Sequence, residues 1–218
     1  DKYGAPAARS NVPFVLGNFV SHWRRHIRES ISYLKDAFRG GVEVGDNIYA
    51  SFAATSLPRY LLSYGHDHLE EVLSEIETTF AFFRKTRNNA SLLRQDLLKH
   101  VVLNLLGRTR HEKTLSDESF DEAAHLAHMQ SIHYGTGIAL YHYYKLFTLC
   151  TWGHFAEALE AAEAADENLP FIASSMQEVD CVFYGALSML RLLPEAAEDT
   201  AKRYRAEIER RRGLLARW

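Results

Sequence analysis

Apolar residues recur at three- and four-residue steps along most of this chain. Between residues 68 and 87, for example, the apolar positions are Leu69, Val72, Leu73, Ile76, Phe80 and Phe83. This spacing places apolar side chains on one face of a helix, as in helices that pack against a core. The alternation typical of strands and the Asn-Gly turns typical of hairpins are both absent. The pattern therefore predicts an all-α protein.

Helix start and stop signals divide the pattern into nine or ten helices with mostly short joints. We expect Ser21, Asp46 and Asn88 to cap the helices that follow them. Gly40 and Gly41 are expected to end the first of these helices, and Pro58 to kink or divide the second. The predicted helices span residues 22–39, 47–64, 68–87, 90–106, 119–133, 136–151, 154–168, 174–193 and 195–215, and the polar stretch 108–118 is the longest predicted loop.

Residues 146–170 are typical of an αα-hairpin that packs against other hairpins. An apolar run ends at Gly153, where a turn is expected, and a second helical run stops before Pro170. The second run carries small residues at helical spacing, namely Ala158, Ala161, Ala162 and Ala165. Small side chains allow a neighbouring helix to approach closely. Short joints between such helices favour a tetratricopeptide-like α-solenoid of stacked antiparallel hairpins.

The same pattern predicts the domain organisation. Residues 1–20 form an irregular lead-in with several Gly and Pro, residues 21–193 a helical-repeat domain, and residues 194–218 a charged helix that leads to a linker or a next module. The chain begins with Asp1 rather than Met, so we expect a fragment of a longer protein. No signal peptide and no apolar run of membrane-spanning length are found, which predicts a cytoplasmic location without membrane contact.

Charge along the chain is uneven, although the net charge is only −3. Residues 112–180 hold twelve acidic residues and two basic ones, Lys113 and Lys145, whereas both flanking regions are mildly basic. The acidic middle is either a docking face for a basic partner or a solvated helix surface. The overall charge does not favour nucleic acid as a partner. Cys150 and Cys181 lie in apolar contexts and are expected to be free, buried thiols.

Two groups of residues are candidates for binding. Tyr144, Phe147 and Trp152 could line one side of a hairpin, whereas Tyr141 and His142 fall on other faces. Tyr141, Tyr144, Phe147 and Trp152 are candidates for a groove in which hydroxyls bond a small effector, although packing in the core is the simpler interpretation. The second group is a basic patch that could bind phosphate or an acidic helix. It is made by Trp23, Arg24, Arg25 and Arg28.

Histidine clusters raise the alternative of a helical metalloenzyme. His66, Asp67 and His68 stand together at a predicted helix start, where they could ligate an ion or, alternatively, form a turn in which Asp67 caps the helix. A second cluster comprises Glu122, His125, His128 and His133. A di-iron site would require a second Glu-x-x-His pair, which the chain lacks. We therefore predict no catalytic residue, no metal and no cofactor, and keep both clusters as the alternative.

The segment 153–170 resembles a tetratricopeptide hairpin, because Gly153, Phe155, Ala158, Ala165 and Pro170 stand at that motif's turn, small-residue and stop positions. The preceding helix departs from the motif at His142 and Leu146. Three longer segments resemble the helical region of large bacterial multidomain signalling proteins, which combine a Ser/Thr-kinase-like module, an AAA-type ATPase, GAF and sensor histidine kinase modules. These segments are residues 19–50, 114–127 and 139–163.

This resemblance implies a helical-repeat regulatory or scaffold segment, not a catalytic one. The chain contains neither a phosphate-binding G-x-x-x-x-G-K-[ST] loop nor a kinase H-R-D or D-F-G element. We therefore expect a non-catalytic module that mediates interaction with flanking modules of its own chain, a regulatory protein or a small effector. Besides the metalloenzyme, the remaining alternative is a self-association module.

Overall fold

The computed structural model describes residues 8–64 and 68–218, and all regular structure in these residues is helical. The predicted all-α class is therefore confirmed for this part of the chain. The chain forms two compact units, Asp1–Leu106 and Gly107–Trp218, each of which is described by itself below. The domain boundaries expected at residues 20 and 193 stay a prediction.

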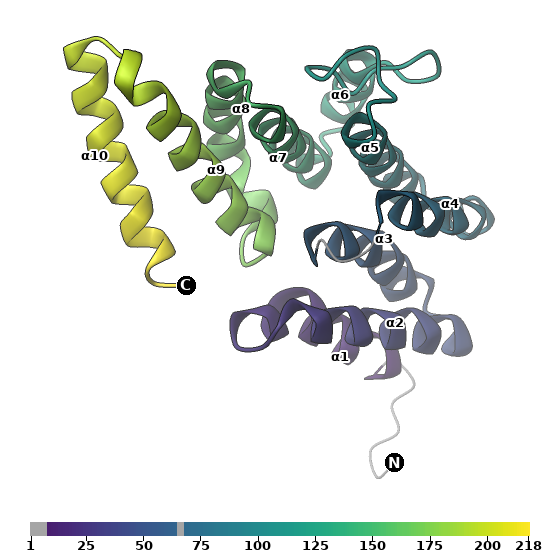
Figure 1. Cartoon of the computed structure of the whole chain (residues 1–218). Coiled ribbons are helices and arrows are strands. Elements are labelled where there is room, and N and C mark those ends of the chain that lie inside the picture. The colour runs from purple at the N-terminus through teal and green to yellow at the C-terminus, as the bar shows by residue number, and fades with distance from the viewer. Residues whose placement is uncertain (1–7, 65–67) are drawn as a thin grey trace. The chain divides into compact units, whose positions relative to one another are not determined.

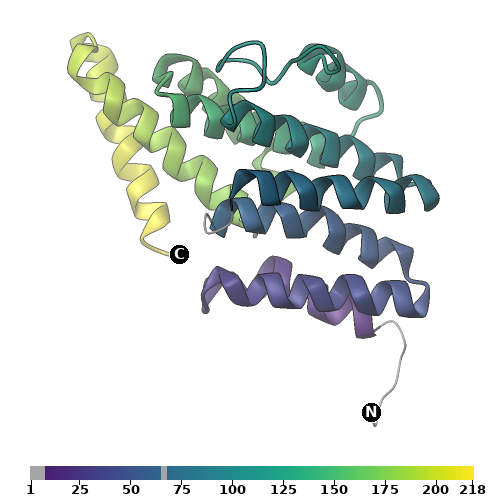
Figure 2. The ribbon, with the colours of Figure 1, turned by 45° about the vertical axis from the view of Figure 1, so that its right-hand side comes forward.

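In the first unit, consecutive helices contact each other in the order of the sequence. Figure 2 shows α2, α3, α4 and α5 side by side. Their shared core includes Leu34, Ala53, Leu57 and Tyr60, each almost fully buried. The helical segments of this unit are α1 (Ala8–Val15), the π-helical η1 (Leu16–Val20), the 3₁₀-helical η2 (Ser21–Trp23), α2 (Ile27–Val44), α3 (Asn47–Tyr64), α4 (Leu69–Lys85) and α5 (Asn89–Leu105).

The N-terminal segment differs from the prediction. Residues 8–20 are helical, so the irregular lead-in expected over 1–20 is wrong for these residues. Phe14 is buried in the core of the first unit and contacts Tyr49 and Phe52 of α3 at ring-centroid distances of 5.7 and 5.6 Å. Pro13 does not prevent this helix, because packing of the apolar face outweighs local propensity.

Helix α2 runs through both glycines that were expected to end it. Gly40 and Gly41 are buried inside α2, which ends at Gly45, where φ is 76°. A Cβ atom on Gly40 would lie 2.3 Å from the carbonyl oxygen of Arg9, so glycine permits the close approach of α1. The expected cap at Ser21 is also wrong, since the helix begins after His26, whose side chain accepts a hydrogen bond from the Arg28 amide.

Helix α3 contains Pro58 without being divided. Tertiary contacts bury the helix around the proline, where Ala54, Leu57 and Tyr60 are almost inaccessible to solvent. This packing offsets the hydrogen bond that proline cannot donate. The predicted caps at Asp46 and Asn88 are confirmed, because their side chains accept hydrogen bonds from the amides of Tyr49 (3.2 Å) and Ser91 (3.0 Å).

The second unit begins with a loop and continues with five α-helices (Figure 1). The loop was predicted over 108–118 and extends from the end of α5 to Asp121, which caps the next helix. The helical segments of this unit are α6 (Glu122–Ser131), α7 (Gly135–Trp152), α8 (Phe155–Asn168), the 3₁₀-helical η3 (Leu169–Ile172), α9 (Met176–Leu192), the 3₁₀-helical η4 (Leu193–Glu195) and α10 (Glu198–Leu215).

Helices α7 and α8 form the predicted hairpin. Gly153 has a φ of 81° at the turn, and α8 ends at Asn168 before Pro170. The four alanines of α8 are buried, as expected. Both cysteines are free and buried, with the Cys150 sulfur 3.1 Å from the Ser188 hydroxyl.

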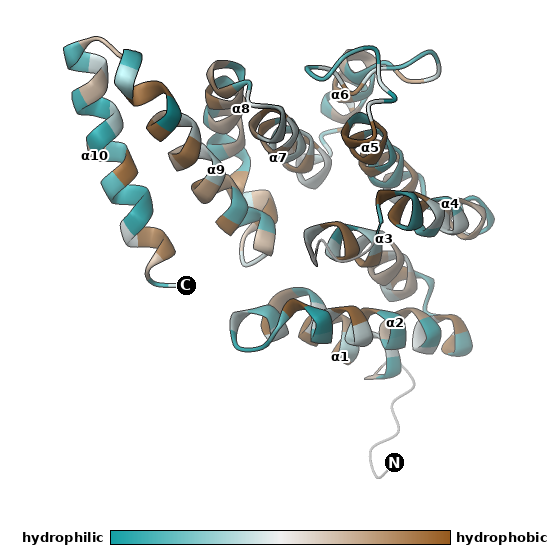
Figure 3. Ribbon diagram, in the orientation of Figure 1, coloured by the Kyte–Doolittle hydropathy of each residue, from teal (hydrophilic) through white to brown (hydrophobic). Residues whose placement is uncertain are grey.

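Helix α10 is mostly hydrophilic (Figure 3), yet it packs against α9 through a buried arginine. Arg211 is only 2% exposed, forms an ion pair with Asp166 and donates a 2.8 Å hydrogen bond to Glu207. Gly185 of α9 makes space for the guanidinium group, because a Cβ atom there would lie 2.5 Å from Nη1. The arginine therefore connects α10 to both α8 and α9.

Candidate functional site

Helix α7 presents aromatic side chains to two different sides. Tyr143 and Phe147 share one side at a spacing of four residues, whereas Tyr141, His142 and Lys145 share another. The first side packs against α9, and the second lines a groove beside α8. These two surfaces are candidate sites of the second unit.

The first surface, here called the aromatic face, consists of Tyr143 and Phe147 of α7 with Phe183 and Tyr184 of α9. The rings of Tyr143 and Phe147 are stacked at 6.2 Å, and Phe147 meets Tyr184 at 5.6 Å. The Tyr143 hydroxyl donates a 3.0 Å hydrogen bond to Asp180. Phe183 contacts Tyr184 and remains 47% exposed. A single exposed ring is common on protein surfaces, so it is the grouping of Phe183 with the half-buried rings of Phe147 and Tyr184 that makes this face a candidate for a partner.

Burial and charge keep the tyrosines of the aromatic face neutral. Burial raises the pKa of Tyr143 well above its usual value, and the neighbouring Asp180 carboxylate raises it further. The pKa of Tyr184 is raised to about 12, again mainly by burial. Both phenols therefore act as hydrogen-bonding groups at neutral pH, and neither supplies a base or a nucleophile.

The second surface, the α7–α8 groove, has a volume of about 370 Å³. Leu126 of α6 and Lys113 of the preceding loop complete its lining. Ala161 and Ala164 of α8 leave space because their side chains are small. From the two helices and these neighbours, the lining residues are Lys113, Leu126, Tyr141, His142, Lys145, Leu149, Glu157, Glu160, Ala161 and Ala164.

Ion pairs hold the loop against the helices around this groove. Lys145 lies 3.2 Å from both carboxylate oxygens of Glu122 and donates a 2.7 Å hydrogen bond to the Lys113 carbonyl. The Lys113 ammonium pairs with Glu157 of α8. Glu122 also accepts hydrogen bonds from the Thr114 hydroxyl and the Leu115 amide. Each lysine of the groove is thus matched by one carboxylate.

Tyr141 and His142 are uncharged groups inside the groove. Burial, reinforced by the Glu122 carboxylate, raises the pKa of Tyr141 above its usual value. Burial also lowers the pKa of His142, against the opposing effect of Glu167. Their rings meet edge to face at 5.2 Å. At neutral pH the groove therefore offers a phenol and a neutral imidazole.

The four aromatic candidates lie in different places, and Tyr141 is on another face of α7 than Phe147, as its spacing predicted. Tyr141 lies in the α7–α8 groove, Phe147 on the aromatic face, and Tyr144 is only 2% exposed, in the core. Trp152 is exposed at the end of α7. Sequence reasoning missed Phe183 and Tyr184, whose signal was the apolar period of the helix 174–193. It also missed Glu160, which looked like one of many solvated carboxylates.

The predicted basic patch is on the surface of the first unit, next to the start of α2. Arg24, Arg25 and Arg28 are exposed, and Trp23 is half-buried against the His22 ring at 4.6 Å. Arg25 forms a 2.8 Å ion pair with Glu29, which balances one of the three charges.

The two histidine clusters gain no support as metal sites. His66 and Asp67 lie outside the described residues, so only His68 of that cluster can be placed, at the N-cap of α4. In the other cluster, Glu122 is engaged by Lys145, and His125 is buried against the Phe120 ring at 4.9 Å. Across residues 8–64 and 68–218, no three His, Cys, Asp or Glu side chains gather in a way that could hold an ion.

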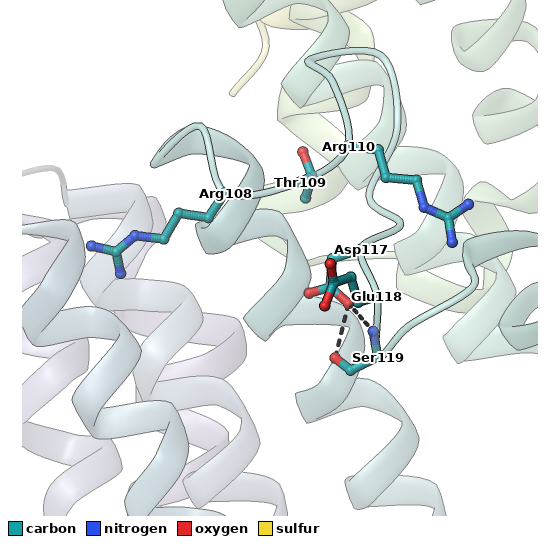
Figure 4. A pocket seen from close by; sticks show the side chains of 6 residues that line it. All are labelled: Arg108, Thr109, Arg110, Asp117, Glu118 and Ser119. Carbon is teal, nitrogen blue, oxygen red and sulfur yellow. Dashed lines mark hydrogen bonds between the residues drawn. The ribbon is translucent and has the colours of Figure 1, made fainter.

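A larger hollow, of about 540 Å³, lies in the loop before α6 and is shown in Figure 4. Asp117 accepts hydrogen bonds from the amide (2.7 Å) and hydroxyl (2.8 Å) of Ser119, so its carboxylate is used to shape the loop. Arg108 and Arg110 extend away from the carboxylates of Asp117 and Glu118 (Figure 4). The hollow thus lacks side chains that converge on a ligand, and we do not regard it as a site.

Comparisons with known proteins do not indicate a function for this chain. No protein-family model matches the chain, and no curated protein or solved structure was found to be significantly similar to it. None of the helices in the described part of the chain combines the length and the apolar composition needed to cross a membrane.

Proposed function

We propose that this chain is a non-catalytic, tetratricopeptide-like helical-repeat module that mediates protein–protein or inter-domain interaction. In this proposal it is a cytoplasmic segment of a bacterial multidomain signalling protein of the kinase and ATPase type that its sequence resembles. Stacked helix pairs form a deformable element, and a partner that prefers one arrangement shifts the population toward it. The chain thereby changes how its flanking modules meet.

The observation that carries the proposal is the aromatic face. Its partly exposed rings come from two helices, and Phe183 is held by its contact with Tyr184 at 5.2 Å. Rigid aromatic side chains bury much area at little entropic cost, which suits them to anchor a partner. We propose an apolar segment of a flanking module or regulatory protein as the occupant, because the face is made of aromatic rings and the Asp180 carboxylate that contacts it is already hydrogen-bonded to Tyr143.

Site-specific photocrosslinking tests this function. A benzophenone amino acid replaces Phe183 or, in a second variant, Leu190, which is also exposed on α9. A control carries the probe at Arg205, an exposed position of α10. In intact cells, both α9 probes are expected to mark the same apolar segment of one module or protein, and the control is expected to leave it unmarked.

Two outcomes contradict the proposal. Equal labelling from all three positions, or no adduct from either α9 probe, means that the aromatic face has no specific partner. A homodimeric adduct formed by the purified chain at Phe183 would instead support the self-association alternative. Stoichiometric metal in the purified protein, measured by elemental analysis, would favour the metalloenzyme alternative.

A further inference from the structure

The α7–α8 groove contains a polar group that the protein itself does not use. Tyr141 is only 9% exposed and its side chain lines the groove. Its ring contacts His142, but within the described residues its hydroxyl makes no hydrogen bond. The hydroxyl oxygen is not one of the fully buried polar atoms that lack a partner, so it is accessible from the groove and can bond a ligand or water. The groove can therefore accept a hydrogen-bonding group at this position.

The charges around the groove determine which group fits. Lys113 is paired with Glu157, and Lys145 with Glu122, so both ammonium charges are balanced. Glu160 also lines the groove and forms no ion pair in the described part of the chain. Because His142 is neutral, no further positive charge opposes Glu160. The two lysines and two glutamates of the lining balance each other, and Glu122, which pairs with Lys145 beside the groove, brings the net charge of the site to −1. This negative charge favours a cation.

The wider surroundings favour the same sign. Residues 112–180, which include α6, α7 and α8, carry twelve acidic residues against two basic ones. The exposed carboxylates Glu163 and Glu167 follow Glu160 on α8. Such a field attracts positively charged segments and speeds their encounter. The negative field therefore attracts a basic peptide, but not a neutral one, before the two molecules make contact.

We propose that the α7–α8 groove binds the arginine side chain of a basic segment in a partner protein. A guanidinium group can donate to the Glu160 carboxylate and to the Tyr141 hydroxyl, and its planar face suits the aromatic rings of Tyr141 and His142. The apolar stem of arginine can pack against Leu126, Leu149 and the two alanines. This proposal deepens the proposed interaction function by naming the chemistry of a partner, and it uses a surface distinct from the aromatic face.

Nuclear magnetic resonance titration of the 218-residue chain tests the groove. The probe is an N-acetylated, C-amidated Gly-Gly-Arg-Gly-Gly peptide, and its matched control carries citrulline, the neutral isostere, in place of arginine. The arginine peptide is expected to cause saturable shifts of the backbone amides of residues 141–145 and 157–164. The citrulline peptide is expected to cause none, because it cannot pair with Glu160.

Two conservative variants separate the groove from general charge attraction. Glu160→Gln removes the charge and Tyr141→Phe removes the hydroxyl, and each is expected to weaken binding of the arginine peptide about three- to tenfold, the range for one lost hydrogen bond. Glu163→Gln is the matched control, since it removes an exposed carboxylate of the same helix without touching the groove. It is expected to change the dissociation constant less than about twofold.

The proposal is overturned if the arginine peptide produces no saturable shifts in the millimolar range, or if Glu163→Gln weakens binding as much as Glu160→Gln. Equal binding of a lysine peptide would overturn the assignment to arginine. Photocrosslinking at Phe183 reports on the other surface. A failed titration with successful crosslinking therefore contradicts the groove proposal and leaves the proposed function in place. A successful titration with failed crosslinking contradicts the proposed role of the aromatic face and leaves the groove proposal in place.

Discussion

His22 in the first unit is half-buried, and its contacts favour the neutral imidazole. The Tyr60 hydroxyl donates to the Asn18 carbonyl oxygen at 2.9 Å and lies 3.3 Å from His22 Nδ1. Because the only phenolic proton points to Asn18, we infer that Nδ1 donates to the tyrosine oxygen. Nε2 is then a buried acceptor, and it has no partner among the described residues. Burial and the neighbouring Arg59 charge lower the pKa of His22 to about 4.

This lowered pKa predicts a pH-dependent stability. His22 in an unfolded chain would titrate near 6.5, so below that pH the unfolded state binds a proton that the folded state excludes. Stability is therefore complete above pH 6.5 and is lost as the pH falls toward about 4. The full shift would be worth about 3 kcal/mol, and partial solvent exposure reduces the expected loss to about 1–2 kcal/mol.

Urea unfolding at pH 7.5 and pH 5 measures this loss. The Trp152→Phe/Trp218→Phe background leaves Trp23, whose ring lies 4.6 Å from that of His22, as the fluorescent reporter. In this background, His22→Gln keeps a hydrogen-bonding side chain but cannot titrate, so its stability should vary less with pH. Identical pH dependence in the two proteins would show that His22 is protonated in the folded state.

At the scale of single helices, the local sequence pattern predicts a helix well when one face is apolar and the opposite face is polar. The apolar spacing of α4 and the Asn88 cap of α5 depend on neighbours in sequence, and both were predicted. The continuation of α2 through Gly40 depends on Arg9, thirty-one residues away, so no local rule could find it. Helical spacing places Tyr141 on another face of α7 than Phe147, as the structure also has it, but α7 is apolar almost all round, so its spacing could not show which of its faces is buried.

The packing of α10 against α8 and α9 could not be predicted from the sequence for a related reason. Arginines near the end of a charged helix resemble solvated or macrodipole-matched residues, and only the structure shows that Arg211 is enclosed by Gly185, Asp166 and Glu207. The ion pair between Arg211 and Asp166 joins residues that are far apart in the sequence. Arg211 is the buried member of the pair, whereas Asp166 and Glu207 are 31% and 30% exposed. The guanidinium group therefore depends on these carboxylates, and this single residue should control how firmly α10 is packed.

We therefore predict that Arg211→Met releases α10. Loss of the guanidinium group removes its bonds to Asp166, Glu207 and the Cys181 carbonyl, while the partly exposed Asp166 is solvated by water. This should weaken the docking of α10 by about 1–2 kcal/mol, equivalent to roughly tenfold faster hydrogen exchange in residues 198–215. Arg212→Met is the control, because Arg212 is exposed and pairs with Glu209 of its own helix. If both variants exchange alike, the buried pair does not hold the helix.

At the scale of the whole molecule, the chain consists of two compact units, each with apolar residues of its own at its centre. In the second unit, the buried residues of α7, α8 and α9 include Leu146, Leu149, Ala158, Ala162 and Val182. Both candidate surfaces, the aromatic face and the α7–α8 groove, are made by residues of this unit. The ion pairs that hold the loop to the groove also belong to it. The compact second unit, residues 107–218, therefore contains all the residues of both candidate surfaces.

This arrangement predicts that residues 107–218 fold and bind on their own. A domain of about this size can bury enough apolar surface to be stable. Expressed alone, it should show a helical circular dichroism spectrum, a single cooperative thermal transition and a dissociation constant for the arginine peptide within about twofold of that of the full chain, because no groove residue is removed.

A fragment that folds cooperatively but does not bind the peptide bound by the full chain would show that residues 1–106 contribute to the site. A fragment that shows no cooperative transition would mean that the second unit depends on the first for its stability.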